Sequence, residues 1–148
     1  MSGGLIVSME RTLAIIKPDA VAARRIGAII GRIEAEDLEV KGVRLICLKK
    51  REAEGFYAVH REKPFFDGLT TFMSSGPIVV LALEAPDAIS RWRRLMGATD
   101  PAEADPGTLR REYGTSIDRN ATHGSDAEDT AASELSYFFS AIDLSSDS

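Results

Sequence analysis

The chain has 148 residues and a formal net charge of −5, and 44% of its residues are hydrophobic and 28% charged. This length suits one domain, and the apolar content is sufficient for a core, which excludes an intrinsically disordered chain. The acidic balance argues against a dedicated nucleic-acid binder, and no apolar run approaches the roughly 20 residues of a membrane-spanning helix.

The first third of the chain predicts a strand, a helix and a second strand. Residues 12–16 are apolar and β-branched and are followed by Lys17-Pro18-Asp19, which is typical of a buried strand that ends in a turn. Apolar residues recur at helical spacing over 20–37, which predicts one amphipathic helix. Partial alternation over 38–48 indicates a strand, in which Cys47, the only cysteine, is predicted to be a buried and reduced thiol.

The middle of the chain predicts three helices and one strand. Residues 51–60 indicate a short helix, and a second helix starts at Pro64 and runs to about Met73. The continuous apolar run at 78–83 is the clearest strand, and 86–96 is predicted to be a helix.

Glycine and proline punctuate residues 97–122, which show little periodicity. We predict a long ordered loop there, with one short helix and a strand near 116–119, and loops of this length are usually functional. Ser125-x-x-Glu128 is a capping-box pattern that predicts the start of a last helix. The apolar stripe of that helix is Ala131, Leu135, Phe138 and Phe139. This order of elements predicts an α+β sandwich with helices on one antiparallel sheet.

His123 is the residue with the clearest chemical potential. It lies between the predicted strand near 116–119 and the start of the last helix. A neutral imidazole is a good nucleophile near pH 7, and the free N–H groups of a helix start attract anions. Gly124 would let the backbone turn with a positive φ. On this segment alone, however, a hydrogen-bonded or surface histidine is the commoner explanation.

Several cations and a pair of aromatic residues suggest a phosphate ligand. Lys17 ends a buried strand, so its position is fixed, and Arg93, Arg110 and Arg119 would complement a triphosphate if they acted together. A single helix arginine such as Arg93 is more typical of a solvated surface. Buried core is the commoner fate of a pair such as Phe65-Phe66, although one of the two rings could stack on a nucleobase. The chain has no phosphate-loop motif, no protein-kinase signature and no Cys/His cluster for zinc.

Six segments stand out in order along the chain. They are residues 10–21 around Lys17-Pro18-Asp19, Lys63-Pro64-Phe65-Phe66, Ser75-Gly76-Pro77, residues 95–101, Pro106-Gly107-Thr108-Leu109-Arg110, and Arg119-Asn120-Ala121-Thr122-His123-Gly124-Ser125-Asp126. Together they resemble the nucleoside diphosphate kinase family over residues 9–139. Asn-x-x-His-Gly-Ser-Asp is the family signature, and Lys-Pro-Asp stands upstream of it at the matching distance. Six ordered matches make the resemblance specific.

The resemblance implies a ferredoxin-like α+β fold with a four-stranded antiparallel sheet and helices packed on it. It implies one nucleoside diphosphate kinase domain over residues 1–148, with a short extension at 1–8, which does not read as a signal peptide, and a frayed tail at 140–148. The implied activity is ping-pong transfer of the γ-phosphate from a nucleoside triphosphate, typically ATP, to a nucleoside diphosphate through a phosphohistidine at His123. Mg²⁺ is expected to be carried mainly by the nucleotide phosphates, with no strong protein ligand.

Residue roles follow from the same resemblance. His123, Lys17, Glu134, Tyr57 and Ser125 match the catalytic set, in which the glutamate orients the histidine and the serine supports that arrangement. Nucleotide binding is implied for Lys17, Phe65, Arg93, Thr99, Arg110 and Asn120, with Phe65 stacking on the base. The chain departs from the family at Arg111-Glu112-Tyr113, where members often carry Gly-Asp-Tyr or Gly-Asp-Phe, and at Ala127, which replaces a common serine.

The expected partners are nucleoside triphosphates and diphosphates and further copies of the chain, in a homo-oligomer that is a hexamer or a tetramer. We expect a cytoplasmic protein with no membrane partner and no nucleic acid as main partner. Two alternatives belong to other classes: a regulatory or nucleic-acid-associated binding protein with weak turnover, and a histidine phosphocarrier with a non-nucleotide donor. The complete catalytic set argues against the first, and Phe65 with the cations argues against the second.

Overall fold

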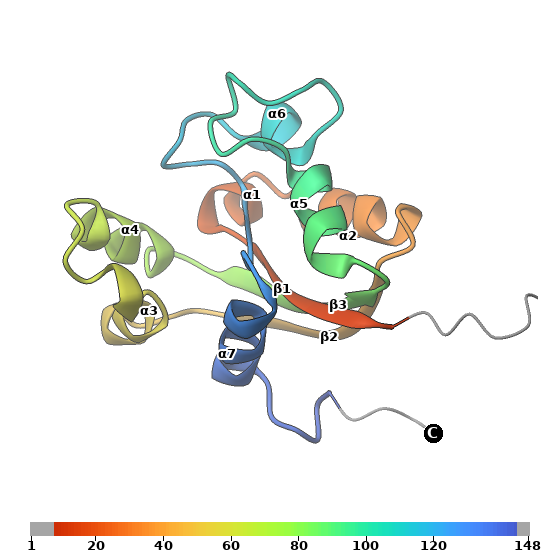
Figure 1. Cartoon of the computed structure of the whole chain (residues 1–148). Coiled ribbons are helices and arrows are strands. Elements are labelled where there is room, and N and C mark those ends of the chain that lie inside the picture. Colours follow the sequence, from red (N-terminus) through yellow and green to blue (C-terminus); the bar gives the residue numbers. More distant parts are fainter. Residues whose placement is uncertain (1–7, 145–148) are drawn as a thin grey trace, which may run out of the picture.

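The computed structural model describes residues 8–144, in which helices cover both faces of one four-stranded antiparallel sheet (Figure 1). The strand order is β2-β3-β1-β4. The strands are β1 (Glu10–Ile16), β2 (Glu39–Ile46), β3 (Ile78–Ala85) and β4 (Thr122–Gly124). The predicted α+β fold with a four-stranded antiparallel sheet is therefore confirmed.

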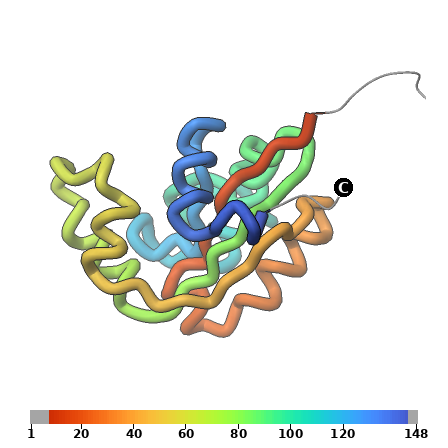
Figure 2. The backbone as a smooth tube through the Cα atoms, turned by 90° about the horizontal axis from the view of Figure 1, so that it is seen from below, coloured from red at the N-terminus to blue at the C-terminus, as the bar shows by residue number. Residues whose placement is uncertain are grey.

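The helices fall into two groups, one for each face of the sheet. Helices α1 (Pro18–Ala22), α2 (Ile26–Ala35), α5 (Ala88–Met96) and α6 (Leu109–Tyr113) contribute to one core cluster. Helices α3 (Lys50–Phe56), α4 (Phe66–Met73) and α7 (Glu128–Phe138) contribute to the other. A 3₁₀ turn, Ala58–His60, follows α3. Figure 2 shows the α3–α4 pair, in yellow, at one end of the molecule.

The central strands β1 and β3 are buried on both faces. In β1, Leu13 and Ile15 point into the core under α3, α4 and α7, whereas Ala14 and Ile16 point into the core under α2 and α5. This alternation is the period of two that strand geometry imposes. Because β1 lies between β3 and β4, the end of β1 brings Lys17 beside the segment that leads into β4.

The single helix predicted over 20–37 is wrong, because the chain forms α1 and α2 with a break between them. Arg24 has a φ of 62°, and the N–H groups of Arg25 and Arg24 donate to the carbonyls of Ala20 and Val21. This is the hydrogen-bond pattern of a Schellman helix end, which usually has glycine at the left-handed position. An arginine at this position does not indicate a helix end, so the periodicity of apolar residues predicted one continuous helix.

The prediction that Cys47 is buried is also wrong. Cys47 is exposed just beyond the edge strand β2, in which Val43 and Leu45 are 54% and 65% exposed. Alternation over 38–48 correctly predicted a strand. It did not tell which face would be covered, because β2 pairs only with β3 and lies at the edge of the sheet.

Two expectations near the signature segment need correction. Residues 116–119 form bends and not a strand, whereas the strand β4 carries His123 itself. The last helix begins at Glu128 after Ala127, so the Ser125 capping box is not formed. The apolar stripe of α7 is confirmed, because Ala131, Leu135, Phe138 and Phe139 are all buried.

The described chain ends in a turn over 141–144, and Leu144 packs against the α7 side of the core. Residues 1–7 and 145–148 lie outside the described part, and so do most of the predicted extension and the end of the predicted tail. No helix between residues 8 and 144 has both the length and the apolarity to cross a bilayer.

Candidate active site

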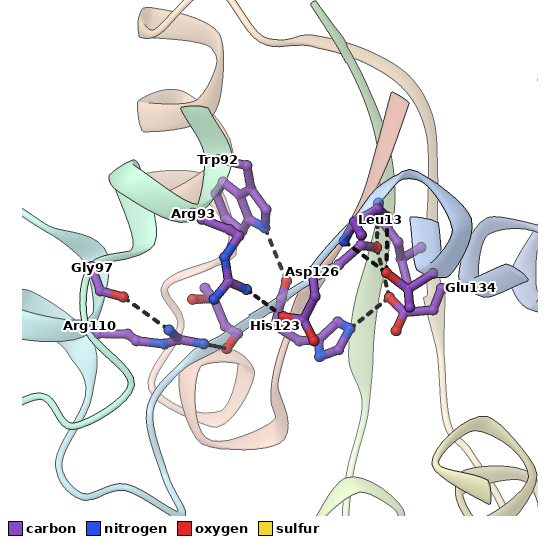
Figure 3. Close-up of polar contacts among 12 residues, drawn as sticks. Leu13, Trp92, Arg93, Gly97, Arg110, His123, Asp126 and Glu134 are labelled. Carbon is purple, nitrogen blue, oxygen red and sulfur yellow. Dashed lines mark hydrogen bonds and ion pairs between the residues drawn. The ribbon is translucent and has the colours of Figure 1, made fainter. Parts of the chain in front are cut away.

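His123 sits at the centre of the short strand β4, opposite Ile15 of β1. The indole Nε1 of Trp92, on α5, donates a hydrogen bond to the backbone carbonyl of His123 over 3.1 Å (Figure 3). The imidazole side chain is 17% exposed. The histidine is thus held by sheet pairing and by α5, while its ring still reaches the surface.

Glu134 and Ser125 orient the imidazole, and Figure 3 shows the contact between Glu134 and the His123 ring. His123 Nε2 and Glu134 Oε1 are 3.0 Å apart, and Ser125 Oγ donates to the same oxygen over 2.7 Å. Burial by itself raises the pKa of Glu134, but the hydrogen bond and charge of His123 and the Ser125 hydroxyl outweigh it, so the pKa is lowered. An ionised carboxylate only accepts, so Nε2 carries the hydrogen and Nδ1 keeps its lone pair.

The use of the Ser125 hydroxyl explains why the predicted capping box does not form. Its Oγ accepts from the N–H of Leu13 at 3.4 Å while it donates to Glu134. The start of α7 is capped instead by Thr130, whose Oγ1 accepts from the N–H of Ala127 at 2.9 Å. Ser125 therefore serves the histidine–glutamate pair and not the helix.

Two aromatic rings from the end of α3 stand against the imidazole. The ring centroids of Phe56 and Tyr57 lie 5.5 Å and 6.1 Å from that of His123, both edge-on. The Tyr57 hydroxyl is buried and has no hydrogen-bond partner among the described residues. Burial, with a contribution from the charge of Glu134, raises the pKa of Tyr57, so the phenol stays neutral and available as a donor at pH 7. Sequence reasoning found Tyr57 but missed Phe56.

Lys17 is buried and joins three parts of the chain. Its Nζ donates to Asn120 Oδ1 over 2.8 Å, and Asn120 Nδ2 donates to the carbonyl of Thr99 over 3.0 Å. Burial, followed by the charge of Arg110, lowers the pKa of Lys17 to about 8, against an opposing effect of Asp19 and Asp118. The lysine thus stands at the end of β1 as a fixed cation whose charge is sensitive to pH near neutrality.

Arg110 is a second buried cation. Its guanidinium donates to the carbonyls of Gly97 and Thr122 over 3.0 Å and 2.9 Å (Figure 3), and its buried Nε has no partner within residues 8–144. Burial and the nearby charge of Arg93 lower its pKa to about 10. No carboxylate of the described residues forms an ion pair with Arg110, so its guanidinium charge is available to a phosphate.

The remaining predicted residues lie around this centre. Arg93 is exposed on α5 and pairs with Asp126, with 2.8 Å between Nη1 and Oδ1. Thr99 is exposed beside Asn120. Phe65, just before α4, is half-exposed, and its ring lies 5.5 Å from that of His60. No direct contact joins Phe65 to His123, so the structure assembles the phosphate side of the predicted site more tightly than the base side.

Trp92 was not predicted, and Asp126 was noted only as the last residue of the signature, with no role. Each contacts a predicted residue on a different element, Arg93 for Asp126 and His123 for Trp92. A surface hollow of about 670 Å³ between α5 and the segment 97–108 reaches Arg93 and Asp126 but not His123. We place the reacting centre at His123, because nucleophilic chemistry needs the oriented imidazole and the buried cations.

Gly124 has a role other than the predicted one. Its φ is not positive; the left-handed residue of this segment is Ala121, with a φ of 73°. A Cβ on Gly124 would come within 2.7 Å of the Trp92 indole and within 2.6 Å of the Met96 methyl group. Glycine is therefore required so that β4 and α5 can pack closely beside the histidine.

We expect Gly124→Ala to destabilise the protein by about 1–3 kcal/mol, because an extra methyl group overpacks this contact. The urea midpoint measures the loss. Gly68→Ala is the matched control, since a Cβ on Gly68 in α4 meets nothing within 4 Å. The control is expected to be neutral or to gain up to about 1 kcal/mol from helix propensity. Equal midpoints for the two variants would contradict the packing argument.

An imidazole oriented by a carboxylate, in the same part of the fold as two buried cations, has the groups that phosphoryl transfer through a histidine would need. The comparisons agree. The family model described as nucleoside diphosphate kinase matches residues 10–144. The chain therefore belongs to the nucleoside diphosphate kinase family, a family of phosphotransferases.

Relatives and solved structures of this family resemble the chain over nearly its whole length. The nucleoside diphosphate kinase of Desulfotalea psychrophila is 61% identical over 92% of this chain and 99% of its own. That of Syntrophotalea carbinolica is 60% identical with the same coverage. The Aquifex aeolicus structure has a TM-score of 0.91 at 41% identity and covers 93% of this chain and 99% of its own. The Halobacterium salinarum structure, in complex with CDP, has a TM-score of 0.90 at 40% identity, with 95% and 94% covered.

Proposed function

We propose that the protein transfers the γ-phosphate of a nucleoside triphosphate to a nucleoside diphosphate in two half-reactions through a phosphohistidine at His123. The observation that carries this proposal is the Nε2–Glu134 hydrogen bond of 3.0 Å, which leaves Nδ1 as the free nucleophile. The buried Lys17 and Arg110 are bound to Asn120 and to the carbonyl of Thr122, in the segment that leads to His123.

In the first half-reaction Nδ1 attacks the γ-phosphorus. The bond between this phosphorus and the β–γ bridging oxygen breaks, and the nucleoside diphosphate leaves with the electron pair. Glu134 stabilises the positive charge that develops on the imidazole. In the second half-reaction a terminal oxygen of another nucleoside diphosphate attacks the phosphorus, and the N–P bond returns its electron pair to Nδ1. A covalent histidine intermediate lets one pocket serve both substrates.

Lys17, Arg110 and Arg93 neutralise the phosphate charge in this scheme, and Thr99, Asn120 and Tyr57 supply polar contacts. Phosphoryl transfer requires mainly positioning and charge stabilisation from the protein. Arg93 has to exchange Asp126 for the phosphate, which its 45% side-chain exposure permits. The buried side chains of Lys17 and Arg110 are fixed in place, so no ion pair has to be exchanged there before a phosphate binds.

The substrate class follows from the same features. The Halobacterium salinarum relative was solved with CDP, which supports a nucleotide ligand for this chain. Phe65, 50% exposed, offers a ring face to the base, and stacking discriminates weakly among bases. Residues 8–144 contain no cluster of three or more His, Cys, Asp or Glu side chains suited to a metal. Mg²⁺ would be held chiefly by the nucleotide phosphates, where it would supply charge neutralisation.

Incubation with γ-labelled ATP and Mg²⁺, followed by a chase with GDP, tests the function. We expect an acid-labile, base-stable label on the protein that moves to GTP. Transfer that requires both nucleotides at once, with no labelled protein, would contradict the covalent intermediate. A label that GDP does not remove would contradict the exchange reaction.

The pKa of Lys17 predicts a pH limit on activity. Its ammonium form is present below about pH 8 and is lost above it, so kcat/KM is expected to fall as pH rises through about 8. Bound phosphate favours the charged form, so the same limb in kcat should lie at higher pH. Steady-state rates from pH 6 to 10 measure both profiles. A kcat/KM that stays flat to pH 10 would contradict a catalytic charge on Lys17.

We infer that the protein is a homo-oligomer, a tetramer or a hexamer, in the cytoplasm. The exposed apolar Val43 and Leu45 on the edge strand β2 support self-association, because an unpaired edge is a site for pairing with another chain. The free, exposed Cys47 thiol suits a reducing compartment. Sedimentation equilibrium distinguishes the assemblies, and a monomer at micromolar concentration would contradict the inference.

A further inference from the structure

We propose that Asp19 is a positioning residue: its carboxylate holds the strained Ala121 in place and so aligns Asn120, Thr122 and His123 with Lys17 and Arg110. This inference rests on the proposed function of these residues. Asp19 lies on α1, close to Lys17 along the chain and far along the chain from the other reacting groups.

The segment that leads into β4 contains a strained turn. The N–H of Thr122 donates to the carbonyl of Asn120 over 2.9 Å, which closes a three-residue γ-turn around Ala121. The φ of Ala121 is 73° and its side chain is fully buried. A γ-turn with a positive φ at its centre is the rare and strained form, and a non-glycine residue persists in it only when its surroundings hold it.

Two contacts hold this turn from the end of β1. Asp19 Oδ2 accepts a hydrogen bond from the N–H of Ala121 over 3.1 Å, although the two residues are 102 apart in the chain. The N–H of Lys17 donates to the carbonyl of Ala121 over 2.8 Å. The N–H and the carbonyl of Ala121 are therefore both bound to residues 17–19. Of these two contacts, only the one with Asp19 uses a side chain, which a substitution can remove.

Relaxation of Ala121 would disturb several phosphate-side groups at once. Asn120 precedes it and accepts from Lys17 Nζ, while the carbonyl of Thr122 follows it and accepts from Arg110. His123 is the next residue. A change of φ at one buried position would thus move two cation contacts and the imidazole together, and misplacement of about 1 Å is sufficient to slow a reaction strongly.

Asp19 acts on Lys17 by its charge as well. The charged groups that face the lysine are Arg110, which lowers its pKa, and Asp19 and Asp118, which raise it against the effect of burial. The second carboxylate oxygen of Asp19, Oδ1, is buried and has no hydrogen-bond partner among the described residues. Replacement of Asp19 by Asn would keep an acceptor for Ala121 and remove only the charge.

The positioning role is tested by a cycle of Asp19→Ala, Ala121→Gly and the double variant, assayed well below their unfolding temperatures. We expect Asp19→Ala to lower kcat/KM by about 10–100-fold and Ala121→Gly to stay close to wild type. The double variant should recover about tenfold over Asp19→Ala, because glycine adopts a positive φ without strain. A double variant no faster than Asp19→Ala would overturn the positioning role.

The charge effect gives a readout that a merely structural residue would not move. In Asp19→Asn the alkaline limb of kcat/KM should shift to lower pH, with little change in rate at pH 6. A limb at the wild-type position would overturn this effect. If Asp19→Ala does not fold, recovery of folded protein in Asp19→Ala/Ala121→Gly supports the strain argument, and no recovery opposes it.

The titration of the Lys17 amine by NMR needs no turnover and separates the two proposals. If the proposed function were wrong, wild-type protein would carry no transferable label, yet the Lys17 titration would still move to lower pH in Asp19→Asn. If only the role of Asp19 were wrong, the label would transfer normally and the Lys17 titration would be unchanged.

Discussion

Replacement of His123 by Ala is expected to abolish phosphoryl transfer, with a loss of about 10⁴-fold or more, because removal of a covalent nucleophile has effects of this order. The protein should remain folded, since β4 is held mainly by its backbone pairing with β1. Loss of the ring leaves Glu134 with its Ser125 hydrogen bond. Both the labelling step and the GDP chase should fail, whereas nucleotide binding should persist.

His60→Ala is the matched control, because the chain has only 2 histidines. His60 lies in the 3₁₀ turn after α3, and its ring faces Phe65, 5.5 Å away. We expect this variant to label normally and to change KM at most a few-fold through the base contact. Protein label that survives in His123→Ala, or disappears in His60→Ala, would show that the wrong histidine has been chosen.

Arg110→Ala is expected to lower kcat by about 10²–10³-fold, the effect of removing one preorganised donor from a charge-stabilising site. Arg110 is rigid before substrate arrives, since its guanidinium bridges the carbonyls of Gly97 and Thr122. The stabilisation that Arg110 provides should therefore be larger in the transition state, in which negative charge develops on the leaving oxygen. A rise in KM with unchanged kcat would mean that Arg110 only binds the ground state.

The neighbouring arginine supplies the control for this prediction. Arg111 donates to the carbonyls of Ala102 and Ala104 and so fastens the loop and not the phosphate side. We expect Arg111→Ala to leave kcat within a few-fold of wild type while it removes the same charge. Equal losses of kcat in both variants would indicate a general effect of charge or loop order. Urea unfolding of each variant shows how much of any loss is stability.

Sequence reasoning was most reliable for buried elements whose apolar residues lie within one helix or strand. The buried run at 78–83 and the stripe of α7 depend on residues within one element, and both are confirmed. The break at Arg24 and the exposed Cys47 were missed for a different reason. A left-handed arginine and the uncovered face of an edge strand leave no mark in the local pattern of apolar residues.

The sequence by itself determined the family and the α+β class, and it supplied the candidate reacting groups, because six ordered segments carry the resemblance. Only the tertiary structure decided how these groups work together. The Ser125 hydroxyl serves Glu134 and not the helix cap, and Asp19 reaches across 102 residues to Ala121. The pKa of Lys17 falls to about 8 chiefly because packing buries it. Such properties depend on which distant residues the sheet and helices bring into contact, and no pattern along the chain contains that information.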